Sequence, residues 1–212
     1  MADQLNQGAL FASGIYSIKL PQFLDAVRAA SDKALQAVGE APGCMLIPHR
    51  MSGNYSDDPT IQDFRQYVAQ TAYNILASQG YAMQPLVTAV VEMWTQEHLT
   101  GSDMPAHVHP GGMQMCAFYF LDCPDGGSQI AFHDPRPGKC AAQLLQADMS
   151  KVTPASDIVL FTPEPGTLML ANSWLPHSFT RNGAATPVRF VHLNIAAFAA
   201  PVQAPDHEVE VV

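Results

Sequence analysis

Three histidines in two separate segments have the residue type and the spacing to bind a metal ion. His107 and His109 are separated by a single residue, and His177 follows 70 positions after His107. In an extended segment, side chains at positions i and i+2 point to the same face, so these first two imidazoles can converge on one point. A third imidazole from a later strand would complete a metal-binding face. Imidazole suits iron, zinc, copper and nickel, and three ligands on one side of an octahedron leave positions open for oxygen and a substrate. The pattern predicts a mononuclear metal site, and iron is the metal we expect.

The sequence around the histidines favours this interpretation over a chance occurrence. An H-x-H pattern arises often by chance, and a histidine in a β-rich chain is commonly a surface residue or a hydrogen-bonded core residue. Here a loop at residues 100–105, which contains Gly, Ser, Asp and Pro, precedes the pair, and an apolar segment follows it. His177 comes shortly after another apolar segment, which begins at the Pro-Gly turn of residues 165–166.

Two helices are expected in the N-terminal part of the chain. Between residues 21 and 38, apolar side chains fall mostly at three- and four-residue steps, with Pro21 in the first turn. A second amphipathic helix is expected from Asp57 or Asp58, either of which can cap it, to Gly80. We expect the two helices to pack together against one face of the following β structure.

The sequence after the second helix, and a short segment before the first, is typical of β-strands. β-Branched and aromatic runs bounded by Pro, Gly and Asn turns are typical of strands. The strands expected are residues 9–20, 86–94, 113–121, 128–132, 158–161, 166–171 and 188–196. The turn at residues 123–127 suggests that 113–121 and 128–132 form a hairpin. Residues 40–57 should be a loop in which 45–47 pair briefly with a sheet. Short strands with no helix among them predict a β-sandwich or barrel.

The length predicts a single domain over residues 1–212. Its helical portion would span about 21–80, its β core about 86–197, and a loose tail about 199–212. The formal net charge of -9 repels nucleic-acid phosphates and anionic membrane surfaces, so neither is an expected partner. No basic and apolar leader segment is evident at the N-terminus, and the four cysteines are irregularly spaced. Together these features predict a cytoplasmic protein with reduced thiols, which acts on a small molecule or another unknown substrate.

With the histidines placed on β structure, the chain resembles a 2-oxoglutarate/Fe(II)-dependent oxygenase family. The family motifs are an H-x-H-P strand start, S-G-x-Y-Y-L, D-P-R, a Gly-led apolar strand running into S-W-L-x-H, and a final strand with Arg and then Asn. The corresponding residues are 107–110 (HVHP), 116–121 (CAFYFL), 134–136 (DPR), 166–171 (GTLMLA) with 173–177 (SWLPH), and Arg189 followed by Asn194. The match covers roughly residues 86 to 196 in order. Cys-Ala in place of Ser-Gly at 116–117 is a departure.

This resemblance implies a double-stranded β-helix, or jelly roll, that uses Fe(II) and the co-substrate 2-oxoglutarate. Oxidative decarboxylation of 2-oxoglutarate to succinate would be coupled to attack on a substrate C–H bond. The superfamily places an Arg about ten to twelve positions beyond the distal histidine to bind the far carboxylate of the co-substrate. Arg189 stands at this position, although a structural ion pair would also account for it. Tyr119 could hydrogen-bond the same carboxylate or could be a core residue.

One departure from the superfamily concerns the metal ligands themselves. Where most members carry a carboxylate two residues after the first histidine, this chain carries His109, which predicts three neutral imidazoles as ligands. Asp134 could supply a carboxylate to the metal, in place of His109 or in addition to it. Alternatively, His109 could lie behind the ligands rather than among them.

Two other functions are compatible with the sequence. A cupin-type metal enzyme is suggested by the spacing of Gly101 and the H-x-H pair, with Gln114 where a cupin motif can have its Glu. The second cupin motif fits badly, because ten residues separate Gly166 from His177. A non-catalytic jelly-roll binding module is the other alternative.

Overall fold

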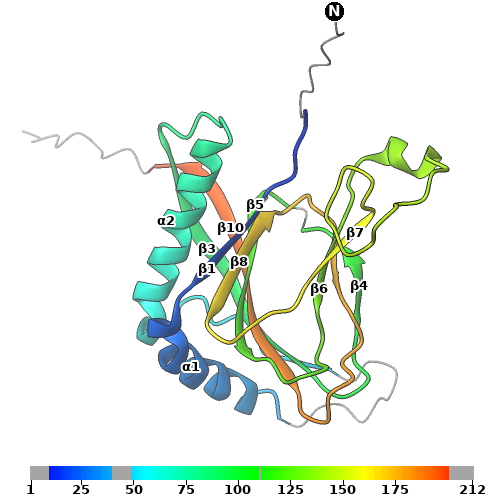
Figure 1. The fold of residues 1–212 in the computed structure, drawn as a ribbon. Coiled ribbons are helices and arrows are strands. Elements are labelled where there is room, and N and C mark those ends of the chain that lie inside the picture. Colours follow the sequence, from blue (N-terminus) through cyan, green and yellow to red (C-terminus); the bar gives the residue numbers. More distant parts are fainter. Residues whose placement is uncertain (1–9, 40–48, 110, 201–212) are drawn as a thin grey trace, which may run out of the picture.

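Within the part of the chain that the structure describes, ten strands form two antiparallel sheets, with two α-helices on the outside of the larger sheet (Figure 1). This computed structural model describes residues 10–39, 49–109 and 111–200. The larger sheet has the strand order β1-β8-β5-β10-β3-β2, and the smaller sheet has the order β4-β9-β6-β7. The six strands of the larger sheet are β1 (Ile15–Lys19), β2 (His49–Met51), β3 (Leu86–His98), β5 (Met113–Asp122), β8 (Thr167–Asn172) and β10 (Val188–Ala199). The four strands of the smaller sheet are β4 (Met104–His107), β6 (Ile130–His133), β7 (Ile158–Phe161) and β9 (His177–Phe179).

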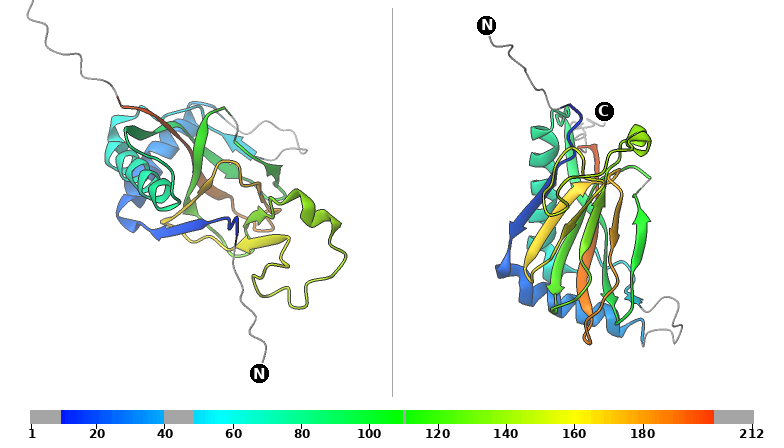
Figure 2. Two further views of the ribbon diagram at one scale, coloured as in Figure 1. Left: turned by 90° about the horizontal axis from the view of Figure 1, so that it is seen from above. Right: turned by 45° about the vertical axis from the view of Figure 1, so that its right-hand side comes forward.

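The two helices form where the sequence predicts them. α1 (Leu24–Gln36) follows a short 3-10 turn that starts at Pro21, and α2 (Gln62–Ser78) follows a similar turn at Pro59. The carboxylate of Asp58 accepts a hydrogen bond from the Thr60 backbone N–H at 2.9 Å, which satisfies one of the free donors at the start of that turn. Both helices pack on β3, as expected from their apolar stripes (Figure 2).

The centre of the larger sheet is buried on both faces, which explains the long apolar runs of β5 and β8. Along β5, Cys116, Phe118 and Phe120 point between the two sheets, whereas Tyr119 and Leu121 point toward the helices. Each set belongs to its own hydrophobic core. The side chains that face the smaller sheet are therefore the ones that can reach the histidines of β4 and β9.

Most of the expected strands are confirmed, and one pairing was wrong. β5 pairs with β8 and β10 in the larger sheet, while β6 pairs with β7 and β9 in the smaller one. They therefore do not form the expected hairpin, because the turn after β5 carries the chain from one sheet to the other. The expected pairing of residues 45–47 and most of the proposed tail lie outside the described residues. Within the described ranges, no helix has the length and apolar character needed to cross a membrane.

Candidate metal centre

The structure brings His107, His109 and His177 together at one end of the smaller sheet. Antiparallel pairing of β4 with β9 places His107 opposite His177. His109 lies just beyond the end of β4, where its backbone N–H donates to the Ser173 carbonyl at 3.0 Å. One ring nitrogen from each histidine can be chosen so that all three lie within 4.8 Å of one another. Among the described residues, this is the one group of His, Cys, Asp and Glu side chains close enough to share a metal ion.

Backbone carbonyls orient two of these rings. The Nδ1 of His107 lies 2.9 Å from the Pro105 carbonyl, and the Nδ1 of His177 lies 3.0 Å from the Leu175 carbonyl. Because a carbonyl can only accept, both Nδ1 atoms carry the proton, and both Nε2 atoms present a lone pair. This hydrogen-bonding arrangement is typical of metal-binding histidines.

The distance between two ring nitrogens fits a shared ion. The Nε2 atoms of His109 and His177 are 3.3 Å apart. Two nitrogen ligands at about 2.1 Å from one ion, at octahedral to tetrahedral angles, are about 3.0 to 3.4 Å apart. The two imidazoles can therefore bind one ion with little movement.

Burial keeps His109 and His177 neutral at neutral pH. His177 is fully buried, and desolvation lowers its pKa to about 3. Partial burial, together with the neighbouring His107, lowers the pKa of His109 to about 4. Neutral imidazole is the form that binds metal, so protons compete weakly with a cation at these positions.

A fourth imidazole, His192 on β10, packs against the three. Its ring centroid lies 4.5 Å from that of His109 and 4.7 Å from that of Phe118. On its other side it stacks on Trp94 of β3, with centroids 4.2 Å apart and planes within 9°. His192 is 1% exposed, and burial lowers its pKa well below the usual value. The Nε2 of His192 and the Nε1 of Trp94 are buried without a hydrogen-bond partner in the structure.

Arg189 does not point toward the histidines, and this corrects our prediction for it. It alternates along β10 with the inward-facing Phe190 and His192, so it lies on the helix-covered face of the sheet. There it meets three carboxylates: Asp32 of α1 at 2.5 Å, Glu97 at 3.2 Å and Asp122 at 3.6 Å. Arg189 therefore has the role that the sequence analysis gave as the alternative, that of a structural ion pair.

Tyr119 is also on the helix-covered face, so the second predicted co-substrate contact is corrected for the same reason. Its hydroxyl donates to the Leu20 carbonyl at 2.7 Å, and its ring lies 4.8 Å from that of Phe64. Burial raises the pKa of Tyr119 to about 12. Of the two roles considered for Tyr119, the structure supports that of a hydrophobic-core residue.

The two remaining candidates lie outside the histidine group. The carboxylate of Asp134 accepts hydrogen bonds from the backbone N–H and the guanidinium of Arg136, among them one of 2.9 Å from Nε and one of 2.6 Å from Nη2, and it is not part of the metal-binding group. Gln114, the residue in the cupin Glu position, is exposed and donates to the Gly112 carbonyl at 3.1 Å.

His192 and Trp94 are the site residues that sequence reasoning missed. Period two along β10 correctly separates His192 from Arg189. It does not say which set faces inward, because both faces of this strand carry large apolar residues. The pairing of Arg189 with Glu97 on β3 identifies the helix-covered face, but this register is known only from the structure.

Comparison with known proteins identifies a family for much of the β core. Residues 92–190 match the family described as "Putative 2OG-Fe(II) oxygenase". No curated protein matches the chain in sequence.

Solved structures share the fold at low sequence identity. The non-heme alpha ketoglutarate dependent carbocyclase SnoK from nogalamycin biosynthesis superposes with a TM-score of 0.61 at 15% identity, covering 92% of this chain and 85% of that chain. A prolyl-4-hydroxylase from Pseudomonas putida gives 0.56 at 12% identity, covering 87% and 93%. An oxidoreductase of the 2OG-Fe(II) oxygenase family from Burkholderia pseudomallei gives 0.55 at 13% identity, covering 86% and 84%. These similarities confirm the mainly β jelly-roll fold class with flanking helices.

Proposed function

We propose that this chain, whose residues 92–190 match the model of the 2OG-Fe(II) oxygenase family, oxidises a small-molecule substrate with Fe(II) bound by His107, His109 and His177. The observation that carries the proposal is the convergence of three imidazoles, with ring nitrogens within 4.8 Å of one another. An all-imidazole site leaves the double charge of Fe(II) uncompensated by the protein. This favours an anionic bidentate ligand such as a 2-oxo acid.

The protein's own residues would orient and isolate the metal. The carbonyls of Pro105 and Leu175 hold two rings with their Nε2 atoms free. Phe118 and Phe132 lie against His177, with ring centroids at 5.1 and 6.2 Å, and exclude water from one side of it. Bound Fe(II) would supply the oxidising chemistry by which O2 and 2-oxoglutarate oxidise a substrate C–H bond.

We propose that the co-substrate is held from the barrel interior by His192 and Trp94 instead of by Arg189. A buried polar atom without a partner costs about 1–3 kcal/mol, so the unpaired Nε1–H of Trp94 and the neighbouring Nε2 of His192, with the proton of His192 on that nitrogen, are best explained by a ligand that accepts from them. The carboxylate oxygens of 2-oxoglutarate are suitable acceptors. Both side chains lie on the same side of the metal-binding group, since His192 packs directly on His109.

Anaerobic titration with Fe(II) and then 2-oxoglutarate tests this function. We expect one Fe(II) per chain and a weak visible charge-transfer band when 2-oxoglutarate is added. Replacing His177 with Ala should lower Fe(II) affinity by more than about 100-fold, because even loss of a ligand's hydrogen-bond partner typically costs 10- to 100-fold. His49→Ala is the matched control: His49 lies on β2 and is not part of the metal-binding group, so its loss should leave Fe(II) binding unchanged.

Exposing the titrated protein to O2 and a supply of 2-oxoglutarate, with an oxygen electrode, separates the alternatives. A cupin-type enzyme would bind metal through the histidines and turn over without 2-oxoglutarate. A binding module would retain no metal, or would bind metal without activating oxygen. Oxygen consumption with release of succinate supports the oxygenase. Absence of Fe(II) binding by the folded wild-type protein would refute it.

We further propose that the reaction takes place in the reducing cytoplasm. Cys116 and Cys123 are free thiols, and burial raises the pKa of each to about 12. Such thiols remain protonated and react slowly, as expected of structural cysteines.

A further inference from the structure

A cavity of about 650 Å³ lies in the structure beside the candidate metal centre. It is set between β1, the edge strand of the larger sheet, and β7, the edge strand of the smaller one. Its floor is made by Ile15, Phe132, Val159, Phe161 and Leu175. This volume is in the range of cavities that bind small organic ligands, about 300–1,000 Å³.

Two residues of the cavity floor contact His177, although none of the three metal-binding histidines lines the cavity itself. Phe132 is the partner of His177 in the β6–β9 register, and their ring centroids are 6.2 Å apart. The carbonyl of Leu175 accepts the hydrogen bond that orients the same imidazole. A molecule that rests on Phe132 and Leu175 is therefore separated from His177 by these two residues.

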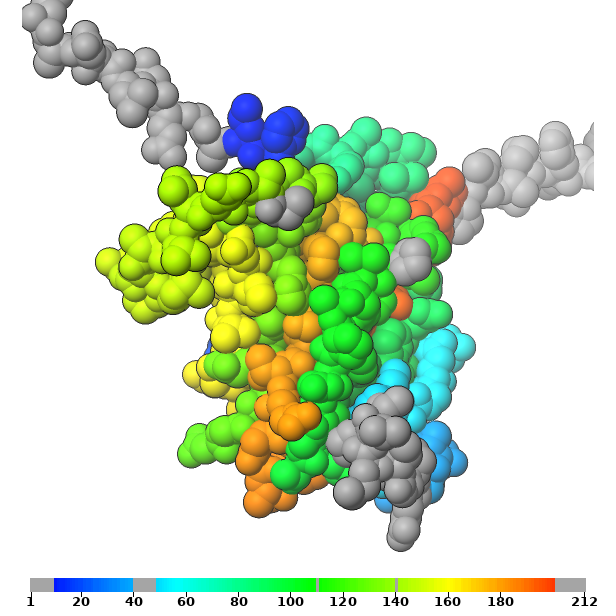
Figure 3. All heavy atoms as spheres, turned by 90° about the vertical axis from the view of Figure 1, so that its right-hand side faces the viewer, coloured from blue at the N-terminus to red at the C-terminus, as the bar shows by residue number. Residues whose placement is uncertain are grey.

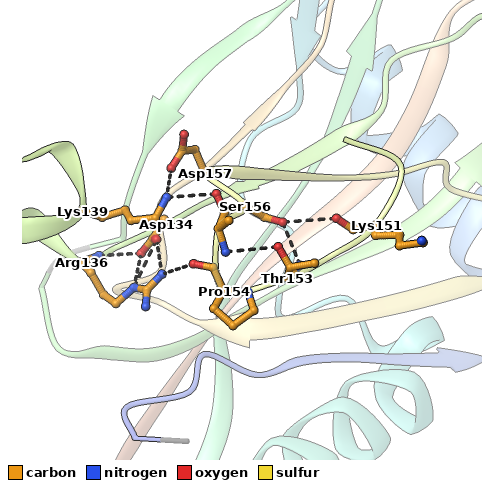
Figure 4. Close-up of polar contacts among 9 residues, drawn as sticks. Asp134, Arg136, Lys139, Lys151, Thr153, Pro154, Ser156 and Asp157 are labelled. Atoms are coloured by element: carbon orange, nitrogen blue, oxygen red, sulfur yellow. Dashed lines mark hydrogen bonds and ion pairs between the residues drawn. The ribbon is translucent and has the colours of Figure 1, made fainter. Parts of the chain in front are cut away.

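A network of polar contacts fixes the outer wall of the cavity (Figure 4). Arg136 links the carboxylate of Asp134 to the carbonyl of Pro154, at 3.2 Å from the latter. Lys139 contacts the carboxylate of Asp157 and the Ala155 carbonyl. These contacts tie the segment before β7 to the segment after β6. In the space-filling view the chain between these strands projects as a lobe beside the N-terminal end of the described chain (Figure 3).

The charges of the wall neutralise one another. The three charged residues that line the cavity are Asp134, Arg136 and Asp157. Asp134 pairs with Arg136 at 2.6 Å, and Asp157 pairs with Lys139. A charged ligand would have to compete with these internal partners, whereas a neutral ligand would not.

The entrance is apolar and exposed to solvent. Leu10, Phe11 and Val152 line the cavity, yet they are 78%, 91% and 72% exposed. Large apolar side chains gathered at the mouth of a cavity mark a surface that gains free energy when a ligand covers it.

We propose that this cavity is the substrate site and that the substrate is an uncharged, predominantly apolar small molecule. Its apolar body would occupy the space between β1 and β7, and its inner end would lie against Phe132 and Leu175, beside His177. The assignment of the occupant as the substrate rests on the proposed function, whereas binding of an apolar molecule to the cavity does not.

A matched pair of fluorescent probes tests the site. N-phenyl-1-naphthylamine is uncharged and apolar, and 8-anilinonaphthalene-1-sulfonate has a similar aromatic body with an added anionic group. We expect the uncharged probe to bind saturably, with one molecule per chain, and the sulfonated probe to bind at least tenfold more weakly. Equal or tighter binding of the sulfonated probe would overturn the assignment to neutral ligands.

Neighbouring positions on β7 locate the bound probe. Val159 faces the cavity, whereas Leu160 points away from it and is 51% exposed. Val159→Trp should weaken binding of the uncharged probe at least tenfold, while Leu160→Trp should leave it within twofold of wild type. Phe11→Ser, at an exposed position of the mouth, should weaken binding several-fold without disturbing the fold. Unchanged binding in both Val159→Trp and Phe11→Ser would overturn the proposal.

Paramagnetic Mn(II) in place of iron then tests whether the occupant lies beside the metal-binding group. With Mn(II) shown to be bound, broadening of the proton NMR signals of the probe in wild-type protein, and none in His177→Ala, is expected. Bound Mn(II) without broadening would overturn the role as substrate site. If wild-type protein binds no metal, the proposed function fails, and the binding of the uncharged probe to Val159→Trp still decides the cavity proposal.

Discussion

Arg189 provides the sharpest test of the structure, because its predicted and observed surroundings have opposite consequences. In the structure it contacts Asp32, Glu97 and Asp122 on the helix-covered face of the larger sheet. Replacing it with Gln removes the positive charge that these carboxylates share. We therefore expect a loss of stability with no loss of 2-oxoglutarate binding.

The size of the loss follows from the exposure of each partner. The side chains of Asp32 and Asp122 are 54% and 41% exposed, so their pairs contribute at most about 1 kcal/mol each. Glu97 is only 8% exposed, and breaking a buried pair costs about 3–5 kcal/mol when the remaining charge has no other partner. Glu97 keeps Arg50, whose Nε lies at 2.8 Å. We expect a net loss of about 2 kcal/mol, which lowers the melting temperature by about 4–8 °C in a chain of this length.

Urea unfolding followed by circular dichroism, together with titration of the Fe(II) protein with 2-oxoglutarate, measures both quantities. Arg181→Gln is a suitable control, because Arg181 is exposed and forms no ion pair within the described chain. The control should change neither quantity. A tenfold or greater loss of 2-oxoglutarate affinity in Arg189→Gln, with stability unchanged, would refute our account of this residue.

Two further predictions concern buried histidines. His192→Phe preserves the stack on Trp94 but removes the ring nitrogen proposed to donate to 2-oxoglutarate. In the same titration we expect Fe(II) binding to be unchanged and 2-oxoglutarate affinity to fall about tenfold, the effect of losing one hydrogen bond to a charged group. Unchanged 2-oxoglutarate affinity would contradict the proposed role. His98 is fully buried, and burial lowers its pKa to about 4 from 6.5. The unfolded chain then binds a proton at His98 that the folded chain does not bind, so this residue's contribution to stability is lost as pH falls from about 6.5 toward about 4. Between pH 7 and pH 5 the loss should be about 2 kcal/mol, and urea unfolding of His98→Phe should lack this component.

The elements most readily predicted are those whose signals are local. Both helices have Pro in their first turn and an apolar stripe, and their positions follow from these features. The convergence of His107 and His109 is likewise a local property of an extended segment. The partner strand β9 has only three residues, which is too short for a periodic pattern.

When a strand is buried on both faces, its sequence does not reveal which side chains face the helices and which face the other sheet. β10 carries Phe190 on one face and Val191 on the other, so hydrophobicity does not distinguish its two sides. The carboxylates that meet Arg189 come from α1, β3 and β5, and only the folded structure brings them together. The hairpin prediction failed for a similar reason, since a strong turn signal does not say whether the next strand stays in the same sheet.

The unequal burial of the two sheets has a consequence for how this enzyme could diversify. Strands of the larger sheet are enclosed by helices on one side and by the smaller sheet on the other, so nearly every substitution there disturbs packing. β7 has an outer face on which Ile158 and Leu160 are each 51% exposed, and its inner face lines the cavity. New substrate preferences are therefore expected to arise through changes in β7 and its flanking segments, while the larger sheet, whose Phe118 and His192 pack against the metal-binding histidines, stays constant.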